Sequence, residues 1–319
     1  MFIRRAVASF AVLALVTVAA FGQDKVKLQW KFEKGKTFYQ EMTTTTSQTM
    51  KVMGQDVSQK QNQTFYFSYT PKDVDKDGNW TVTQKIEGVK ITIDINSQPI
   101  SYDSTNPASA NNALAEFFKQ LVGTEFTLTI DKNMKVTKVE GKDNFIKNLV
   151  QTNTQMEGLL KKILNDKTLQ EMADPTFGMV PGKEVTKGET WKKTSELSLG
   201  PIGGYNNEYT FTYQGKDPKD ANIALIKVET KLTYKAPGAD AEGSTLPFKI
   251  KGANLTSKNA GGTVRFNIAK GRIEDSELKL TLDGSLDIEI ANTTTKVDLK
   301  QEQTTTIKNS DTNPIPAKK

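Results

Sequence analysis

The 319-residue sequence contains no cysteine and no histidine. The absence of cysteine excludes a disulfide, a thiolate metal site, a thiol nucleophile and a lipid-modified cysteine. The absence of histidine excludes a Ser-His-Asp triad, an imidazole base and an imidazole metal site. The rest is an ordinary globular composition, with 36% hydrophobic residues, 25% charged residues and a formal net charge of +6. We therefore predict a folded protein without a cofactor, stabilised by its core alone.

The first 22 residues have the pattern of a secretory signal peptide. Arg4 and Arg5 precede an uncharged run over residues 6–20, and Ala20 and Gly22 place small residues before a predicted cleavage after Gly22. Cleavage after Ala20 is the alternative. The run is shorter than the ~20 residues that span a bilayer, and the mature chain is expected to have no transmembrane segment. The sequence thus predicts export to the periplasm or the exterior.

Most of the remaining sequence alternates between apolar and polar residues with a period of two. For example, Leu286, Ile288 and Ile290 alternate with Asp287 and Glu289. This alternation is typical of antiparallel strands with one buried face. Turn-forming residues separate such runs at 53–56, Asp77-Gly78, 269–271 and Asp283-Gly284. The predicted fold is mostly β (β-rich α+β), with a large curved antiparallel sheet or two related sheets from an internal duplication, and a few covering helices.

Three stretches carry apolar residues at helical spacing instead. They predict helices over residues 111–121 and 144–164, and a short helix from Asp166 to Met172 that ends before Pro175. These helices are expected to lay their apolar faces on the sheet. Phe145, Leu149 and Leu160 belong either to the permanent core or to a lid over a ligand.

The two halves of the chain resemble each other in the same order, which predicts the duplication. The similar pairs are residues 34–38 with 187–191, Phe65, Phe67 and Tyr69 with Tyr209, Phe211 and Tyr213, and residues 126–130 with 264–268. The predicted organisation is a signal peptide (1–22), a first β-rich half (23–142), a helical connector (143–175), a second β-rich half (176–310) and a flexible tail (311–319).

Three segments share a further pattern: residues 32–39, 127–141 and 179–191, the last with a proline and a Gly-Glu-Thr-Trp element before a predicted strand. Together they resemble an uncharacterised family of secreted bacterial proteins known only as a domain of unknown function. The resemblance implies no activity, because the family has none assigned. The family tends to carry a glycine turn where this sequence has Asn133-Met134, so a looser hairpin is expected here.

Motifs that would carry chemistry are incomplete. Residues 73–79 match the first half of a calcium loop, but Gln84 stands where the bidentate glutamate is needed. A solvated Asp-Gly hairpin is therefore the favoured interpretation. Ser276 and Lys279 match a serine acyltransferase pattern, but they lie on a predicted strand and point to opposite faces. A carboxylate-based hydrolase stays open, because acids alone can supply a nucleophile and an acid.

The positive charge is spread along the chain rather than clustered. This distribution argues against a nucleic-acid partner and favours weak attraction to an anionic envelope surface. The two aromatic stripes are either the buried faces of equivalent strands or the lining of a ligand groove. The candidate groove residues are Phe65, Phe67, Tyr69, Tyr209, Phe211, Tyr213, Phe145, Leu149 and Leu160.

We predict from these observations a non-enzymatic, exported binding or structural protein. Its more specific form is a carrier of an apolar ligand or a lipid. A hydrolase of cell-surface glycans and a cell-surface matrix protein are the alternatives. A carrier needs an apolar cavity, a hydrolase needs two inward carboxylates within ~10 Å, and a matrix protein needs neither.

Overall fold

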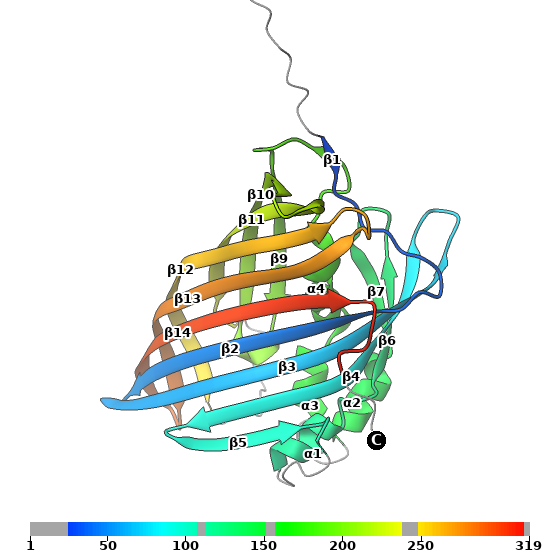
Figure 1. Cartoon of the computed structure of the whole chain (residues 1–319). Coiled ribbons are helices and arrows are strands. Elements are labelled where there is room, and N and C mark those ends of the chain that lie inside the picture. Colours follow the sequence, from blue (N-terminus) through cyan, green and yellow to red (C-terminus); the bar gives the residue numbers. More distant parts are fainter. Residues whose placement is uncertain (1–24, 107–112, 151–156, 238–247, 316–319) are drawn as a thin grey trace, which may run out of the picture.

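A single large antiparallel sheet dominates the protein. The computed structural model describes residues 25–106, 113–150, 157–237 and 248–315, so the predicted signal peptide lies outside the described residues (Figure 1). The sheet has 12 strands in the order β7-β6-β4-β3-β2-β14-β13-β12-β11-β10-β9, with β5 paired to β4, and β1 pairs separately with β8. The predicted fold class, mostly β with a large antiparallel sheet and a few helices, is confirmed.

The strands are β1 (Val26–Lys27), β2 (Phe38–Val52), β3 (Gln55–Val74), β4 (Trp80–Ile95), β5 (Gln98–Asp103), β6 (Glu125–Ile130), β7 (Val136–Glu140), β8 (Glu184–Val185), β9 (Thr190–Ser198), β10 (Gly204–Asp217), β11 (Asp220–Lys235), β12 (Lys249–Asn267), β13 (Arg272–Ile290) and β14 (Thr293–Ser310). The helices are α1 (Ala113–Lys119), α2 (Lys142–Val150), α3 (Glu157–Ile163), α4 (Asp166–Gly178) and the 3-10 turn η2 (Gly200–Ile202).

Two meanders meet in the sheet at β2 and β14. One runs through β2, β3, β4, β6 and β7, and the other through β9 to β14. When the strands are counted from the start of each meander, the three similar sequence pairs lie at or before corresponding strands. These are the first strands, β2 and β9, the second, β3 and β10, and the fourth, β6 and β12. The turns before β2 and β9 also match, because the amides of Gly35 and Gly188 donate to Pro71 and Tyr213 at 2.8 and 2.7 Å. These correspondences support the predicted duplication.

Strand pairing changes one detail of the repeat. Phe38 lies opposite Tyr69, and Trp191 lies opposite Phe211, so Tyr69 and Phe211 correspond. The sequence similarity matched Phe211 with Phe67 instead, two residues away. A shift of two keeps every side chain on its face, so alternating aromatic residues cannot distinguish the two registers.

The sheet curls strongly, and α4 lies where its two edges approach each other (Figure 1). This helix contacts both β7 and β9, the ends of the strand order. Phe177 of α4 is fully buried, and its ring lies 5.2 Å from Trp30 and 5.8 Å from Tyr69. The helix therefore closes the gap between the edges and forms the centre of the core.

The predicted end of this helix was wrong, because α4 continues through Pro175 to Gly178. A proline inside a helix removes one backbone hydrogen bond and costs stability. Here the final turn is held from outside by two tryptophans. The indole N–H groups of Trp30 and Trp191 donate to the carbonyls of Phe177 and Met179, each at 2.9 Å. Tertiary contacts thus outweigh the local preference.

One predicted turn was also wrong. Asp283-Gly284 lies inside β13, where Gly284 pairs with Leu299 and a Cβ would collide with the carbonyl oxygen of Asn254. The glycine marks a close strand approach, and the chain turns at Ala291-Asn292, where φ is +47° and +63°. The predicted turns at 53–56, Asp77-Gly78 and 269–271 are confirmed.

The hairpin at Asn133-Met134 forms without a glycine. Met134 takes the left-handed conformation (φ +62°) and is buried. The Asp131 carboxylate accepts hydrogen bonds from the amides of Asn133 and Lys135 at 2.8 and 2.9 Å. These bonds tie the turn down without a glycine, and a looser hairpin stays a prediction.

Candidate functional site

The pairing register sorts the side chains of the five central strands onto two faces. One face continues from Phe38 and Tyr69, whose rings stack and of which Tyr69 packs against Phe177 of α4 inside the curl. We call it the concave face. Beyond these two residues it includes Val89, Ile91, Ile93 and Ile95 of β4; Val57, Gln59, Gln61, Gln63 and Phe65 of β3; Met42, Thr44, Thr46, Gln48, Met50 and Val52 of β2; Val297, Leu299, Gln301, Gln303, Thr305 and Ile307 of β14; and Leu278, Leu280, Leu282, Leu286, Ile288 and Ile290 of β13. None of these side chains is charged.

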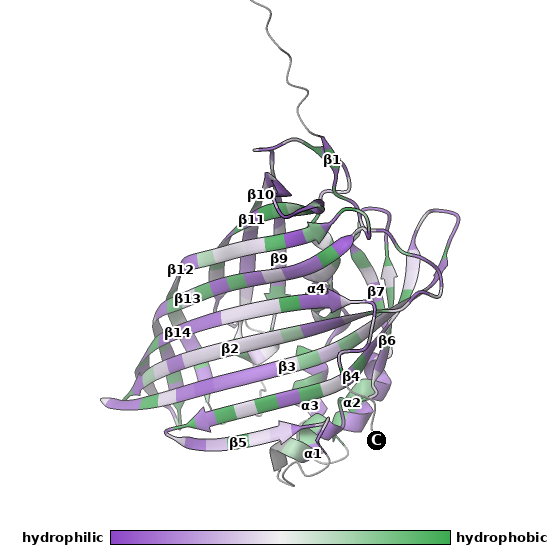
Figure 2. Ribbon diagram, viewed as in Figure 1, coloured by the Kyte–Doolittle hydropathy of each residue, from purple (hydrophilic) through white to green (hydrophobic). Residues whose placement is uncertain are grey.

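The opposite, convex face of the same strands carries the charges. Lys279 and Glu277 pair at 2.9 Å on β13, and Lys300 and Glu302 pair at 3.3 Å on β14. Such exposed pairs contribute little to stability because water screens them. Figure 2 shows the resulting alternation of apolar and hydrophilic residues along the strands. The contrast between the faces is therefore one of charge as well as hydropathy.

An uncharged polar stripe crosses the middle of the concave face. Gln61 donates to Gln63 at 2.8 Å, Gln303 donates to Thr305 at 3.4 Å, and the hydroxyls of Thr44 and Thr305 lie 3.3 Å apart. We call Thr44, Thr46, Gln48, Gln59, Gln61, Gln63, Gln301, Gln303 and Thr305 the amide stripe. Aliphatic residues of β4 flank it on one side and those of β13 on the other. The face thus offers hydrogen bonds between two apolar walls.

A small cavity of about 80 Å³ lies where α4 meets the concave face. Its lining comprises Asp174, Pro175, Gly178, Met179, Lys193, Thr194, Ser195, Tyr209, Phe211, Val228 and Leu278. Asp174 is held by the Val136 amide at 2.9 Å, and burial raises the pKa of Tyr209. This volume is far below the roughly 300–1,000 Å³ of typical ligand pockets, so the cavity can hold the end of a ligand but not a whole lipid.

The predicted groove residues divide into two groups. Phe65, Phe67 and Tyr209 are half-buried on the concave side of β3 and β10, and Tyr209 also lines the α4 cavity. The others are buried in the core: Tyr69, Phe211, Tyr213, Phe145, Leu149 and Leu160. Phe211 reaches the cavity from within that core. Contact of any of these residues with a ligand stays a prediction.

The amide stripe was missed in the sequence. Its signal is present, because Gln59, Gln61 and Gln63 recur at every second position, as do Gln301 and Gln303. Their significance depends on β2 lying between β3 and β14, which brings the glutamines of distant segments onto one face.

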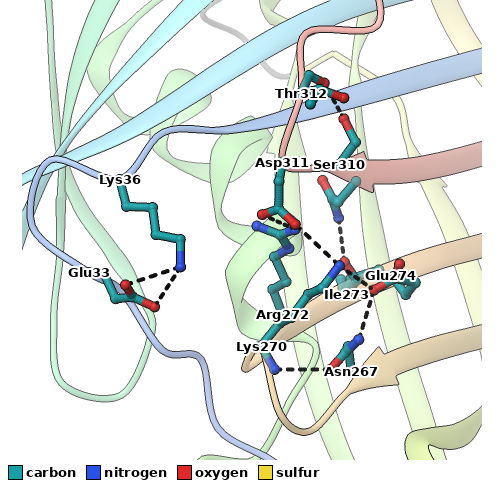
Figure 3. Close-up of polar contacts among 11 residues, drawn as sticks. Glu33, Lys36, Asn267, Lys270, Arg272, Ile273, Glu274, Ser310, Asp311 and Thr312 are labelled. Carbon is teal, nitrogen blue, oxygen red and sulfur yellow. Dashed lines mark hydrogen bonds and ion pairs between the residues drawn. The ribbon is translucent and has the colours of Figure 1, made fainter.

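A second pocket, of about 310 Å³, lies at the core end of the sheet and has an ionic character. Arg272 is nearly buried there and donates to Asp311 at 2.7 Å (Figure 3). Its guanidinium lies 5.6 Å from the ring centre of Phe38. The hydrogen bond from Arg272 holds the pKa of Asp311 below its usual range. This network clamps the start of the predicted tail to β13 and confines the charges of the concave face to its core end.

The half-matched calcium loop is an ordinary hairpin. The Asp75 carboxylate accepts hydrogen bonds from the amides of Asp77 and Asn79, each at 2.9 Å, and these bonds lower its pKa. Across the described residues, no group of three acidic side chains is placed to hold a metal ion. The carboxylate is thus engaged with its own turn.

A family model described as a family of unknown function (DUF6263) matches residues 77–271. The chain belongs to this family. Its membership confirms the resemblance drawn from the sequence segments and assigns no activity. No curated protein matches the chain. Within the described part of the chain, no helix has the length and apolarity to cross a bilayer.

Among solved structures, the DUF6263 chain is similar to a lipovitellin structure described by its lipid–protein interactions. The TM-score is 0.50, and the two sequences are 10% identical over 91% of the DUF6263 chain. The DUF6263 chain spans only about a quarter (26%) of the lipovitellin chain. At this identity the likeness shows a related fold and nothing further. The translocator domain of the autotransporter NalP from Neisseria meningitidis also matches, with a TM-score of 0.19, 8% identity and coverage of 86% and 88%, but this likeness is too low to support an argument.

Proposed function

We propose that this DUF6263 protein binds a lipid with hydrocarbon chains and an uncharged polar group along its concave face. The observation that carries the proposal is the segregation of charge: apart from Arg272 at the core end, the five central strands place their ionic side chains on the convex face and none on the concave face. Burying an unpaired charge against hydrocarbon is costly, so a face without charges suits an apolar ligand.

The amide stripe refines the class of ligand. Hydrocarbon chains gain free energy from contact with the isoleucines of β4 and the leucines of β13. Ester, amide or hydroxyl groups of the ligand would exchange hydrogen bonds with glutamine and threonine side chains in the middle. A charged headgroup finds no counter-ion there, so uncharged lipids are favoured. The related fold of a lipovitellin structure described by its lipid–protein interactions is consistent with this reading.

The two alternatives have less support. A two-carboxylate hydrolase needs inward acids, and the concave face of the central strands, all of which are described, supplies none. A matrix protein needs no uncharged inner face. We place the binding outside the cytoplasm because residues 1–22 have the pattern of a signal peptide.

Adjacent residues of β4 provide the test. Ile93 is half-buried on the concave face, and Thr92 is exposed on the convex face. We expect Ile93→Lys to weaken binding of a fluorescent monoacylglycerol at least about tenfold, because a charge enters the apolar wall, and Thr92→Lys to bind like the parent. The measurement is a fluorescence titration, with native mass spectrometry of the purified protein to detect retained lipid.

A matching fluorescent fatty acid separates the ligand classes. The parent is expected to prefer the monoacylglycerol at a pH where the fatty acid is ionised. If the parent binds neither probe and carries no lipid, the proposed function is wrong.

A further inference from the structure

Exposed apolar side chains gather at one end of the sheet. Six large apolar residues are strongly exposed among the described residues, and four of them lie at or beside three hairpin turns: Met53 (73%), Ile95 (44%), Ile100 (46%) and Ile290 (48%). The turns join β2 to β3, β4 to β5 and β13 to β14. All three are at the end of the sheet away from the core, on the left in Figure 1. We call these four residues the turn rim.

Met53 is placed there against its local preferences. Its φ of +50° lies in the left-handed region, and Gly54 follows with φ +82°. A two-residue turn of this kind favours asparagine at the first position, because side chains such as methionine are strained there. The side chain is also 73% exposed, so packing within the chain does not repay the strain. A contact between Met53 and something outside the chain would explain both the strained backbone and the exposed apolar side chain.

The turn rim continues the apolar walls of the concave face. Ile95 follows Ile91 and Ile93 on the same side of β4, and Ile100 of β5 lies directly opposite Ile93. Ile290 ends the row of leucines and isoleucines on β13. A ligand leaving the concave face at this end would therefore meet apolar side chains up to the edge of the sheet.

We infer that the turn rim docks on the surface of a lipid bilayer. Side chains projecting from three separate turns suit a fluid apolar medium, which accommodates each one independently. A protein partner would instead need a continuous complementary surface. The inference rests on the proposed function in one respect: docking would allow a lipid to pass between the bilayer and the concave face. The docking itself does not require a bound ligand.

The experiment compares the two ends of the sheet. The rim variant combines Met53→Asn, Ile95→Thr, Ile100→Thr and Ile290→Thr, which keep the turn and strand preferences of each position. The control is Val74→Thr, because Val74 is 44% exposed at the opposite end of β3. Each protein is floated with vesicles of zwitterionic phosphatidylcholine, which carry no net charge. Partition of the rim variant should fall at least about tenfold, and that of the control should be unchanged.

Met53→Asn alone gives a sharper result. It should raise the melting temperature, because asparagine suits the turn, and also lower vesicle partition. If Met53 had only a structural role, the substitution would change the melting temperature and leave vesicle partition unchanged. Binding that requires anionic phosphatidylglycerol, disappears in high salt and is equal in the rim variant would overturn the inference and indicate electrostatic adsorption.

The failure of docking can be told from the failure of the proposed function. Met53→Asn changes a turn residue outside the concave face, so this variant should still bind the fluorescent monoacylglycerol in the absence of vesicles. Absence of vesicle binding by the parent overturns the docking inference, whereas absence of monoacylglycerol binding by the parent overturns the proposed function.

Discussion

The two ends of the concave face are built from the same strands but have different surroundings. At the core end, Phe38 of β2 and Tyr69 of β3 are buried and their rings stack at 5.1 Å. At the other end, Met50 and Val57 lie on the same strands and the same face, directly opposite each other, yet they stay half-buried. Phe177 of α4 packs on Tyr69 at the first end. At the other end burial differs from strand to strand, because Leu299 of β14, directly opposite Met50, is buried. Burial is thus decided by what packs over each position, not by the alternation within a strand.

The largest expected effect is on the covered end. Phe177→Ala removes the fully buried ring at the centre of the core and should lower the free energy of unfolding by about 3–5 kcal/mol. Met50→Ala, in the uncovered end, should cost about 1 kcal/mol, because its side chain is already partly in water. Chemical denaturation measures both. Equal losses would show that the two ends are packed alike.

Leu160→Ala asks whether the helices belong to the core or form a lid. Leu160 of α3 is buried, and we expect a loss of about 2–5 kcal/mol on thermal unfolding, as for ordinary core leucines. Binding of the fluorescent monoacylglycerol should then be unchanged at temperatures where the variant is folded. A small loss of stability combined with weaker probe binding would instead identify a lid.

The smallest effect appears only at alkaline pH. Burial raises the pKa of Tyr69 well above its usual value of about 10, so the folded protein keeps a proton that the unfolded chain releases. Stability from this group is complete below about pH 10 and falls as the pH rises above it. Tyr69→Phe should flatten the decline of stability between pH 10 and 11.5. An unchanged slope would mean that other groups control alkaline unfolding.

The sequence identified much of the fold and part of the site. Period-two alternation predicted the strands, whereas the aromatic stripes of β3 and β10 were matched two residues out of register. The end of α4 was misjudged because Pro175 is a local signal, whereas Trp30 and Trp191 stabilise the last turn from distant segments. Gly284 was mistaken for a turn because close strand approach and chain reversal both favour glycine.

The sequence alone determined which side chains share a face along each strand between bulges, because alternation is a local consequence of extended backbone geometry. It also determined the chemistries that are missing, since absent cysteine and histidine cannot be supplied by folding. Only the tertiary structure decided which strands are neighbours. That choice brought Gln61 and Gln303 onto one uncharged face with β2 between them, and it left the rim at Met53 uncovered. Pairing between distant strands depends on contacts across the whole chain, which no local pattern specifies.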